Sequence, residues 1–190
     1  MQRVTQLALL LALLLAPAAA RAHANSVCNL RIQVEDQTVR VTVSATRRAL
    51  APTLGVAEGV NPVQGLFRQK REVVLKHVGG YINVANGAAL CQLTHASLEL
   101  PDDEGARVQL RYRCPRRVEL MRLRYDLLFD HDPAHRALLA VGREGEAARG
   151  AVLNNSKREF TLEQEVSPWT NAGDFFVLGL EHIFGGPDHI

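Results

Sequence analysis

The sequence lacks the short motifs that identify the common enzyme classes. It contains no G-x-S-x-G nucleophile elbow, no glycine-rich phosphate-binding loop and no H-E-x-x-H zinc-protease motif. It also lacks the C-x-x-C spacing that is typical of structural zinc sites. We therefore predict that the protein is not an enzyme.

The sequence also lacks an excess of positive or negative charge once residues 1–24 are set aside. Arg3 and Arg21 account for two of the 22 basic residues, so the remainder carries 20 basic and 20 acidic side chains. The short basic clusters at 47–48, 68–71 and 111–117 alternate with apolar or acidic residues, which is typical of solvated strand and helix faces. This balance gives no indication of nucleic acid or of an anionic surface as a partner.

The N-terminal apolar run is too short to cross a membrane. Leu7–Leu15 has nine residues, whereas a bilayer core needs roughly 20. Arg3 precedes the run and small residues follow it as far as Ala24, an order typical of a secretory signal peptide. We predict a signal peptide over residues 1–24, cleaved after Ala22 or Ala24, rather than an uncleaved anchor.

Without this segment 166 residues remain, which is enough for one domain with its own core. We expect residues 25–166 to form this domain outside the cytoplasm. Its three cysteines predict one disulfide and one cysteine left over. Cys91 and Cys114 are the preferred pair, because they lie in two strand-like segments, one before and one after the turn-like Pro101–Gly105. Cys28 would then be free, or could replace either partner.

Most of this domain has the pattern of β-strands. Leu30–Val34 and Val39–Val43 alternate apolar and polar residues, and Glu35–Gln37 between them predicts a hairpin turn. Further segments with an extended pattern are Tyr81–Val84, Leu90–Leu100, Ala106–Cys114, Val118–Phe129, Ala137–Val141, Ala151–Leu153 and Phe160–Glu165.

One segment has helical spacing instead. Between Asn61 and His77 the apolar residues recur every three or four positions, and Gly79–Gly80 follows as a stop. Many short strands with a single helix favour a mainly β fold, so we predict an antiparallel β-sandwich with one helical excursion.

Residues 167–190 differ from the domain. Ser167–Asn171 has the composition of a linker, and the apolar run Asp174–Leu180 carries the kind of aromatic residues that membrane interfaces attract. The 18 residues from Gly173 to Ile190 include several charged side chains and cannot span a bilayer by themselves. We expect them to form a linker and the start of a transmembrane helix of a longer protein.

The end of the chain carries the motif G-x-x-H-I-x-x-G-x-D-H, from Gly179 to His189. Phe176–Ile190 resembles the start of the first membrane helix in the HupE/UreJ family of hydrogenase and urease accessory proteins, and Tyr125–Arg136 resembles the extracytoplasmic part of its longer members. The resemblance implies a polytopic inner-membrane protein with residues 25–170 on the periplasmic side, taking part in transport of nickel or another divalent metal. Nickel/cobalt permeases have four residues between the corresponding histidine and aspartate, whereas five residues separate His182 from Asp188.

The motif contains residues that suit a metal ion. Imidazole nitrogens bind borderline divalent ions such as nickel, and a neighbouring carboxylate offsets their charge. On an ideal helix His182 and His189 would point within about 20° of each other, although Gly185–Pro187 would interrupt that helix. We predict His182, Asp188 and His189 as metal ligands; the alternative is that they are helix-end residues at the membrane interface.

A second group of similar residues lies at Asp130, His131, Asp132 and His135. Pro133 follows two acidic residues there, which favours turn and capping roles over metal binding. His77 and His95 are isolated and predict no site. As the alternative to the membrane protein we keep a self-contained periplasmic β-sandwich that binds a partner or ligand.

Overall fold

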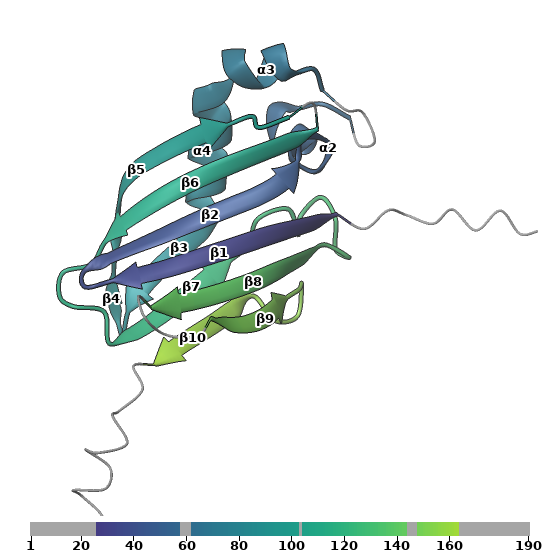
Figure 1. The fold of residues 1–190 in the computed structure, drawn as a ribbon. Helices are drawn as coiled ribbons and strands as arrows, with labels where there is room; N and C mark the ends of the chain where they lie inside the picture. The colour runs from purple at the N-terminus through teal and green to yellow at the C-terminus, as the bar shows by residue number, and fades with distance from the viewer. Residues whose placement is uncertain (1–25, 58–61, 103, 144–147, 164–190) are drawn as a thin grey trace, which may run out of the picture.

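The computed structural model describes residues 26–57, 62–102, 104–143 and 148–163, which form two β-sheets packed face to face (Figure 1). One sheet has six strands in the order β5-β6-β2-β1-β8-β9, and the other has four in the order β10-β7-β3-β4. The strands are β1 (Val27–Glu35), β2 (Thr38–Thr46), β3 (Ile82–Asn86), β4 (Ala89–Leu90), β5 (Gln92–Glu99), β6 (Gly105–Arg113), β7 (Leu120–Tyr125), β8 (Arg136–Arg143), β9 (Arg149–Leu153) and β10 (Glu159–Glu163). The predicted mainly β fold is confirmed.

The predicted opening hairpin is formed by β1 and β2. Alternate residues of the two strands are buried between the sheets, and partners such as Ile32 and Val41 lie opposite each other. Asp36 adopts a positive φ of 47° in the turn, a conformation that Asp tolerates better than most residues. The other side chains of both strands project away from the core, so this hairpin has one apolar and one polar face.

One pair of strands corrects the prediction of an antiparallel sandwich. β1 pairs with β8 in parallel, from Val27 opposite Arg136 to Val34 opposite Arg143. The alternation of apolar residues shows which face of a strand is buried, but it carries no information about the direction of the neighbouring strand.

The helical segment also differs from the prediction. Two helices, α3 (Gln64–Gln69) and α4 (Arg71–Gly80), replace the single expected helix, and α4 continues through both glycines. A Cβ atom at Gly79 would lie 2.9 Å from Leu93 Cδ2, so glycine allows α4 to pack closely against β5. The helix nevertheless ends at Gly80, as the expected stop at Gly79–Gly80 predicts, with both glycines in its last turn.

A short helical turn after β2 was not predicted. It comprises α2 (Arg47–Leu50) and the 3₁₀-helix η1 (Ala51–Leu54). The Thr46 hydroxyl caps α2 by accepting a hydrogen bond from Ala49 N at 3.2 Å. These elements, together with α4, pack at the β2, β5 and β6 end of the larger sheet (Figure 1).

The strand predicted over Val118–Phe129 is shorter than expected. β7 ends at Tyr125, and the backbone then turns, with Leu128 at a φ of 70°. Leu127, Leu128 and Phe129 are buried nevertheless. Their apolar character reflects packing of a turn into the core rather than an extended conformation.

The predicted disulfide between Cys91 and Cys114 is confirmed, with the two Cα atoms 4.2 Å apart. Both cysteines flank a register pair of the β5–β6 hairpin, Gln92 opposite Arg113. Cys28 is free and buried. In the part of the chain that the structure describes, no helix has the length and apolar character needed to cross a membrane.

Candidate binding face

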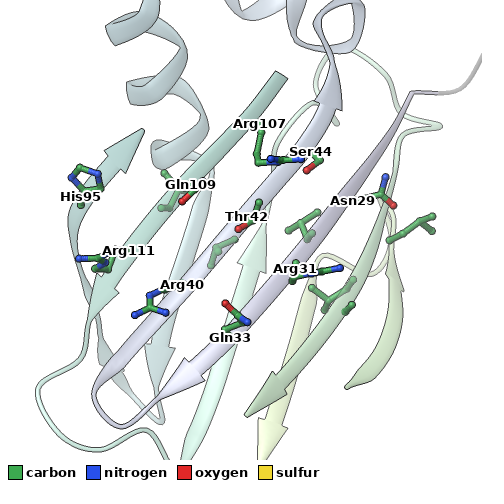
Figure 2. A pocket seen from close by; sticks show the side chains of 16 residues that line it. Asn29, Arg31, Gln33, Arg40, Thr42, Ser44, His95, Arg107, Gln109 and Arg111 are labelled. Atoms are coloured by element: carbon green, nitrogen blue, oxygen red, sulfur yellow. The ribbon is translucent and has the colours of Figure 1, made fainter. Parts of the chain in front are cut away.

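The outer face of the six-stranded sheet carries a field of polar and basic side chains (Figure 2). They occupy the strand positions that alternate with the core residues, so the same pattern that buries one face exposes the other. We call this surface the basic face; its labelled members are Asn29, Arg31, Gln33, Arg40, Thr42, Ser44, His95, Arg107, Gln109 and Arg111.

The basic face borders a hollow with a volume of about 910 Å³. Polar side chains from β1, β2, β5 and β6 line most of it, and Leu138 and Ala140 of β8 line one side. Leu138 is 43% exposed, and Val152, its partner on β9, is 44% exposed. The hollow therefore combines a broad cationic area with a small apolar margin.

The strand register places two arginines and a histidine next to one another. Arg111 lies opposite Arg40, and His95 lies opposite Arg111 on the other side. A β-bulge between Leu93 and His95 makes this arrangement possible, because the additional residue in β5 directs His95 outward. Like charges on directly opposite residues are unfavourable unless something compensates them.

Acidic side chains compensate only part of this charge. Arg40 forms an ion pair with Glu35 at 2.7 Å, and Arg107 forms one with Glu99 at 3.4 Å. Gln109 also donates to Glu99, at 2.7 Å. Among the described residues, Arg31 and Arg111 have no acidic side chain within ion-pair distance. The basic face therefore keeps uncompensated positive charge that could hold anionic groups.

A second polar cluster contains the residue types of a serine hydrolase triad. Ser26 Oγ donates to Asp132 Oδ2 at 2.7 Å, and His135 Nδ1 lies 2.9 Å from the carbonyl oxygen of Ser26. Because a carbonyl only accepts, Nδ1 carries the proton, and Nε2 accepts from the Tyr125 hydroxyl at 2.8 Å. Ser26 Oγ also lies 2.8 Å from His135 Nδ1. Because Nδ1 carries a proton, Ser26 Oγ accepts there and donates its own hydrogen bond to the aspartate, so the histidine does not act as its base, unlike the arrangement in a catalytic triad.

Burial keeps the histidine of this cluster uncharged. It lowers the pKa of His135, so the ring is neutral at pH 7. Burial also raises the pKa of the neighbouring Cys28 thiol to about 12, which leaves it protonated and unreactive. The cluster ties the residue before β1 to the 128–135 turn, and we interpret it as a structural clamp.

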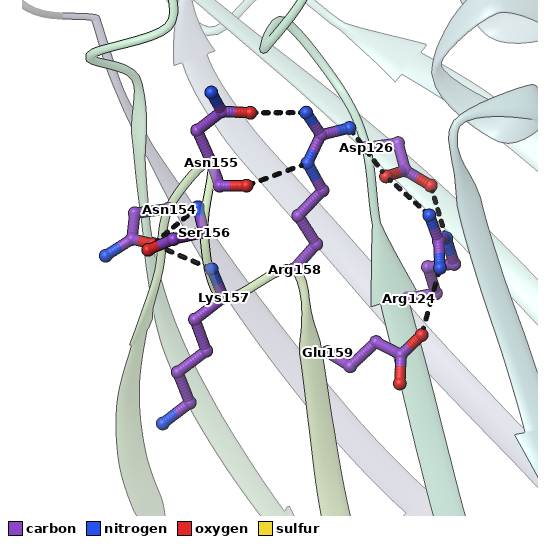
Figure 3. Close-up of polar contacts among 8 residues, drawn as sticks. All are labelled: Arg124, Asp126, Asn154, Asn155, Ser156, Lys157, Arg158 and Glu159. Atoms are coloured by element: carbon purple, nitrogen blue, oxygen red, sulfur yellow. Dashed lines mark hydrogen bonds and ion pairs between the residues drawn. The ribbon is translucent and has the colours of Figure 1, made fainter.

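A third group of polar contacts lies beside the four-stranded sheet (Figure 3). Asp126 pairs with Arg124 at 2.7 Å and with Arg158 at 3.0 Å, and Arg124 also pairs with Glu159 at 3.0 Å. Arg158 lies over the Phe129 ring, 4.8 Å from its centroid. These arginines are occupied by partners within the protein.

The predicted metal ligands His182, Asp188 and His189 lie outside the described residues. Of the second group, Asp132 accepts from Ala134 N at 2.9 Å and from Ser26, which confirms its predicted turn role. The described residues contain no group of three or more His, Cys, Asp and Glu side chains that could hold a metal ion.

Sequence reasoning missed the basic face. Its arginines are visible as the polar positions of alternating strands, but they come from segments far apart in the chain. Only the strand order brings them together. A comparison with protein-family models finds no match, and a comparison with curated proteins finds none either.

Proposed function

We propose that the chain is the exported binding domain of a HupE/UreJ-like membrane protein that handles nickel or another divalent metal. The observation that carries this proposal is the motif from Gly179 to His189, with His182, Asp188 and His189 as the metal ligands. In this arrangement the motif acts at the membrane, and residues 25–170 lie on the periplasmic side.

The disulfide supports the location of the domain in an oxidising compartment. Structural disulfides persist outside the cytoplasm and are rare within it, where thiols are kept reduced. The bridge between Cys91 and Cys114 fixes the end of the β5–β6 hairpin, beside the basic face. The apolar run Leu7–Leu15 supplies the matching export signal.

The geometry of the described residues supports binding rather than catalysis. The hydrogen bonds of Ser26, Asp132 and His135 hold a turn and leave no activated nucleophile. The basic face, by contrast, presents beside one hollow the guanidinium groups of Arg31 and Arg111, which have no acidic partner among the described residues. We therefore assign binding of a partner or ligand to the β-sandwich and metal binding to the C-terminal motif.

The metal assignment is tested with the full chain extracted from membranes of cells grown with nickel. Replacing His182 or His189 with Ala should lower the bound nickel per chain by more than about tenfold, because each removes a ligand. His95→Ala is the matched control, since it removes a histidine of the basic face. Unchanged nickel content and uptake in both motif variants would reject the assignment.

Export is tested separately. Cys91 and Cys114 should resist alkylation in intact cells until a reductant is added, and a periplasmic reporter enzyme fused after Glu163 should be active. Alkylation of both cysteines without reductant, together with an inactive reporter, would place the domain in the cytoplasm and refute this part of the proposal.

A self-contained periplasmic binding protein is the second candidate function. The observation that favours it is the basic face, which is built entirely from described residues and needs no membrane segment. Detergent phase partition separates the two candidates: the full chain should enter the detergent phase if residues 167–190 are inserted in lipid, and the aqueous phase otherwise.

A further inference from the structure

We propose that the basic face is the docking surface for an acidic polypeptide, a partner segment that presents several carboxylates in an extended conformation. This inference rests on the binding role proposed above and names the class of partner. It is independent of the metal assigned to the C-terminal motif.

The first argument is charge complementarity. Arg111 and Arg40 lie on directly opposite positions, and Arg31 lies on β1 next to them, diagonally across from Arg40. Glu35 compensates only Arg40 within this group. A carboxylate bound between the guanidinium groups would relieve their repulsion, and the planar guanidinium fork matches a carboxylate in two-point contact.

The second argument is the strength of each contact. The Arg40 and Arg107 side chains are 45% and 44% exposed, so water and salt screen charges on this face. A single exposed ion pair changes an equilibrium constant by a factor of about five at most. One small anion would therefore bind weakly, and only a ligand that engages several arginines at once would be held.

The spacing fits a peptide. Arg31 and Arg111 are separated by two strand spacings, roughly 10 Å across the sheet, and by two residues, roughly 7 Å along it. Alternate side chains of an extended peptide point to the same side at intervals of roughly 7 Å. Carboxylates at this interval can reach neighbouring arginines when the peptide crosses the strands obliquely.

The remaining lining also suits a polypeptide. Gln33, Gln109 and Thr42 supply donors and acceptors for peptide groups, and the exposed Leu138 offers a contact for an apolar side chain. Among the described residues that line the hollow there is no Phe, Tyr or Trp side chain, and His95 carries the single aromatic ring. Single-stranded nucleic acids depend on such rings for base stacking, so the lining favours a peptide over a nucleic acid.

The test measures binding of fluorescent poly-L-glutamate to the full chain in an uncharged detergent, by fluorescence anisotropy. The variant R31Q/R111Q should bind about tenfold more weakly than the unchanged protein, because two charge contacts are lost. The matched control R116Q/R117Q removes two exposed arginines from the loop after β6 and should change the affinity less than about threefold.

A third variant separates charge from folding. R31K/R111K keeps both charges but loses the two-point guanidinium contact, so it should bind more weakly than the unchanged protein and more tightly than R31Q/R111Q, with the same circular dichroism spectrum. Raising the salt concentration from about 50 mM to about 500 mM should weaken binding of the unchanged protein, because the Debye length falls severalfold.

Three results would overturn the proposal. These are no binding of poly-L-glutamate at low salt, equal weakening in R31Q/R111Q and R116Q/R117Q, and tighter binding to anionic phospholipid vesicles or to a single-stranded oligonucleotide. A failed nickel or export test with intact peptide binding would reject the HupE/UreJ-like function and leave the docking surface in place.

Discussion

The two outer faces of the sandwich use arginine in different ways. Beside the four-stranded sheet, Arg124 and Arg158 share Asp126, and Arg122 donates to the Gly87 carbonyl at 3.4 Å. On the six-stranded sheet, Arg31 and Arg111 have no acidic partner among the described residues. The first arrangement holds the protein together, whereas the second leaves charge available for another molecule.

The contrast shows why the overall charge of a chain is a poor guide to its surface. The sequence without residues 1–24 is formally neutral. Its acidic side chains, however, are placed so that they neutralise one face more completely than the other. Three changes test whether the two faces differ as described, beginning with the largest expected effect.

Removal of the disulfide should have the largest effect, because the bridge fixes the end of the β5–β6 hairpin in the six-stranded sheet. Changing Cys91 and Cys114 to Ala removes a cross-link over 23 residues, which should lower the free energy of unfolding by about 3 kcal/mol. Urea unfolding measures this change. Addition of a reductant should destabilise the unchanged protein and Cys28→Ala by a similar amount, because both keep the bridge, whereas the variant without Cys91 and Cys114 should not respond to the reductant. If the variant without the bridge were as stable as the unchanged protein, the backbone pairing of β5 with β6 alone would fix this end of the hairpin.

Asp126→Asn should have the next largest effect, on the opposite face. The Asp126 side chain is only 20% exposed and contacts two arginines, so its loss should cost about 1 kcal/mol after allowance for solvent screening. Glu159→Gln is the control, because that side chain is 59% exposed and should cost less than about 0.5 kcal/mol. Equal costs for the two variants would mean that Asp126 has no special role in holding β10 beside β7.

The same residue predicts a pH dependence. Burial acts to raise the pKa of Asp126, but the hydrogen bonds and charges of Arg124 and Arg158 outweigh it and lower the pKa below the usual 3.8. The ionised form is therefore favoured by folding, and its contribution is present above pH 3.8 and disappears as the pH falls through the lower, folded-state pKa. Unfolding of the protein and of Asp126→Asn at several pH values should differ least at the most acidic pH.

Much of the fold could be predicted from local patterns. The β1–β2 hairpin follows from alternation in Leu30–Val43, and the disulfide follows from the placement of Cys91 and Cys114 in neighbouring strand-like segments. The parallel pairing of β1 with β8 could not be predicted, because it joins strands about a hundred residues apart. The turn at Leu128 was missed because a buried turn and a buried strand are equally apolar.

The binding face could be predicted only in part. Alternation already indicates that Arg31 and Arg40 point away from the core, since Ile32 and Val41 beside them are buried. That Arg111 lies opposite Arg40 depends on β6 pairing with β2, after an intervening helical region and β3–β5. The bulge that turns His95 toward Arg111 has no signature in the sequence that we could identify.

Arg111→Gln should have the smallest effect on stability. It is also the most direct test of the difference between the two outer faces of the sandwich. If this side chain makes no favourable contact within the protein, its loss should change the free energy of unfolding by less than about 0.5 kcal/mol, as for most surface substitutions. Removal of the repulsion with Arg40 should make any change stabilising, and more so at low salt. A clear destabilisation in urea unfolding would mean that Arg111 has a structural partner, and the distinction between the two faces would be lost.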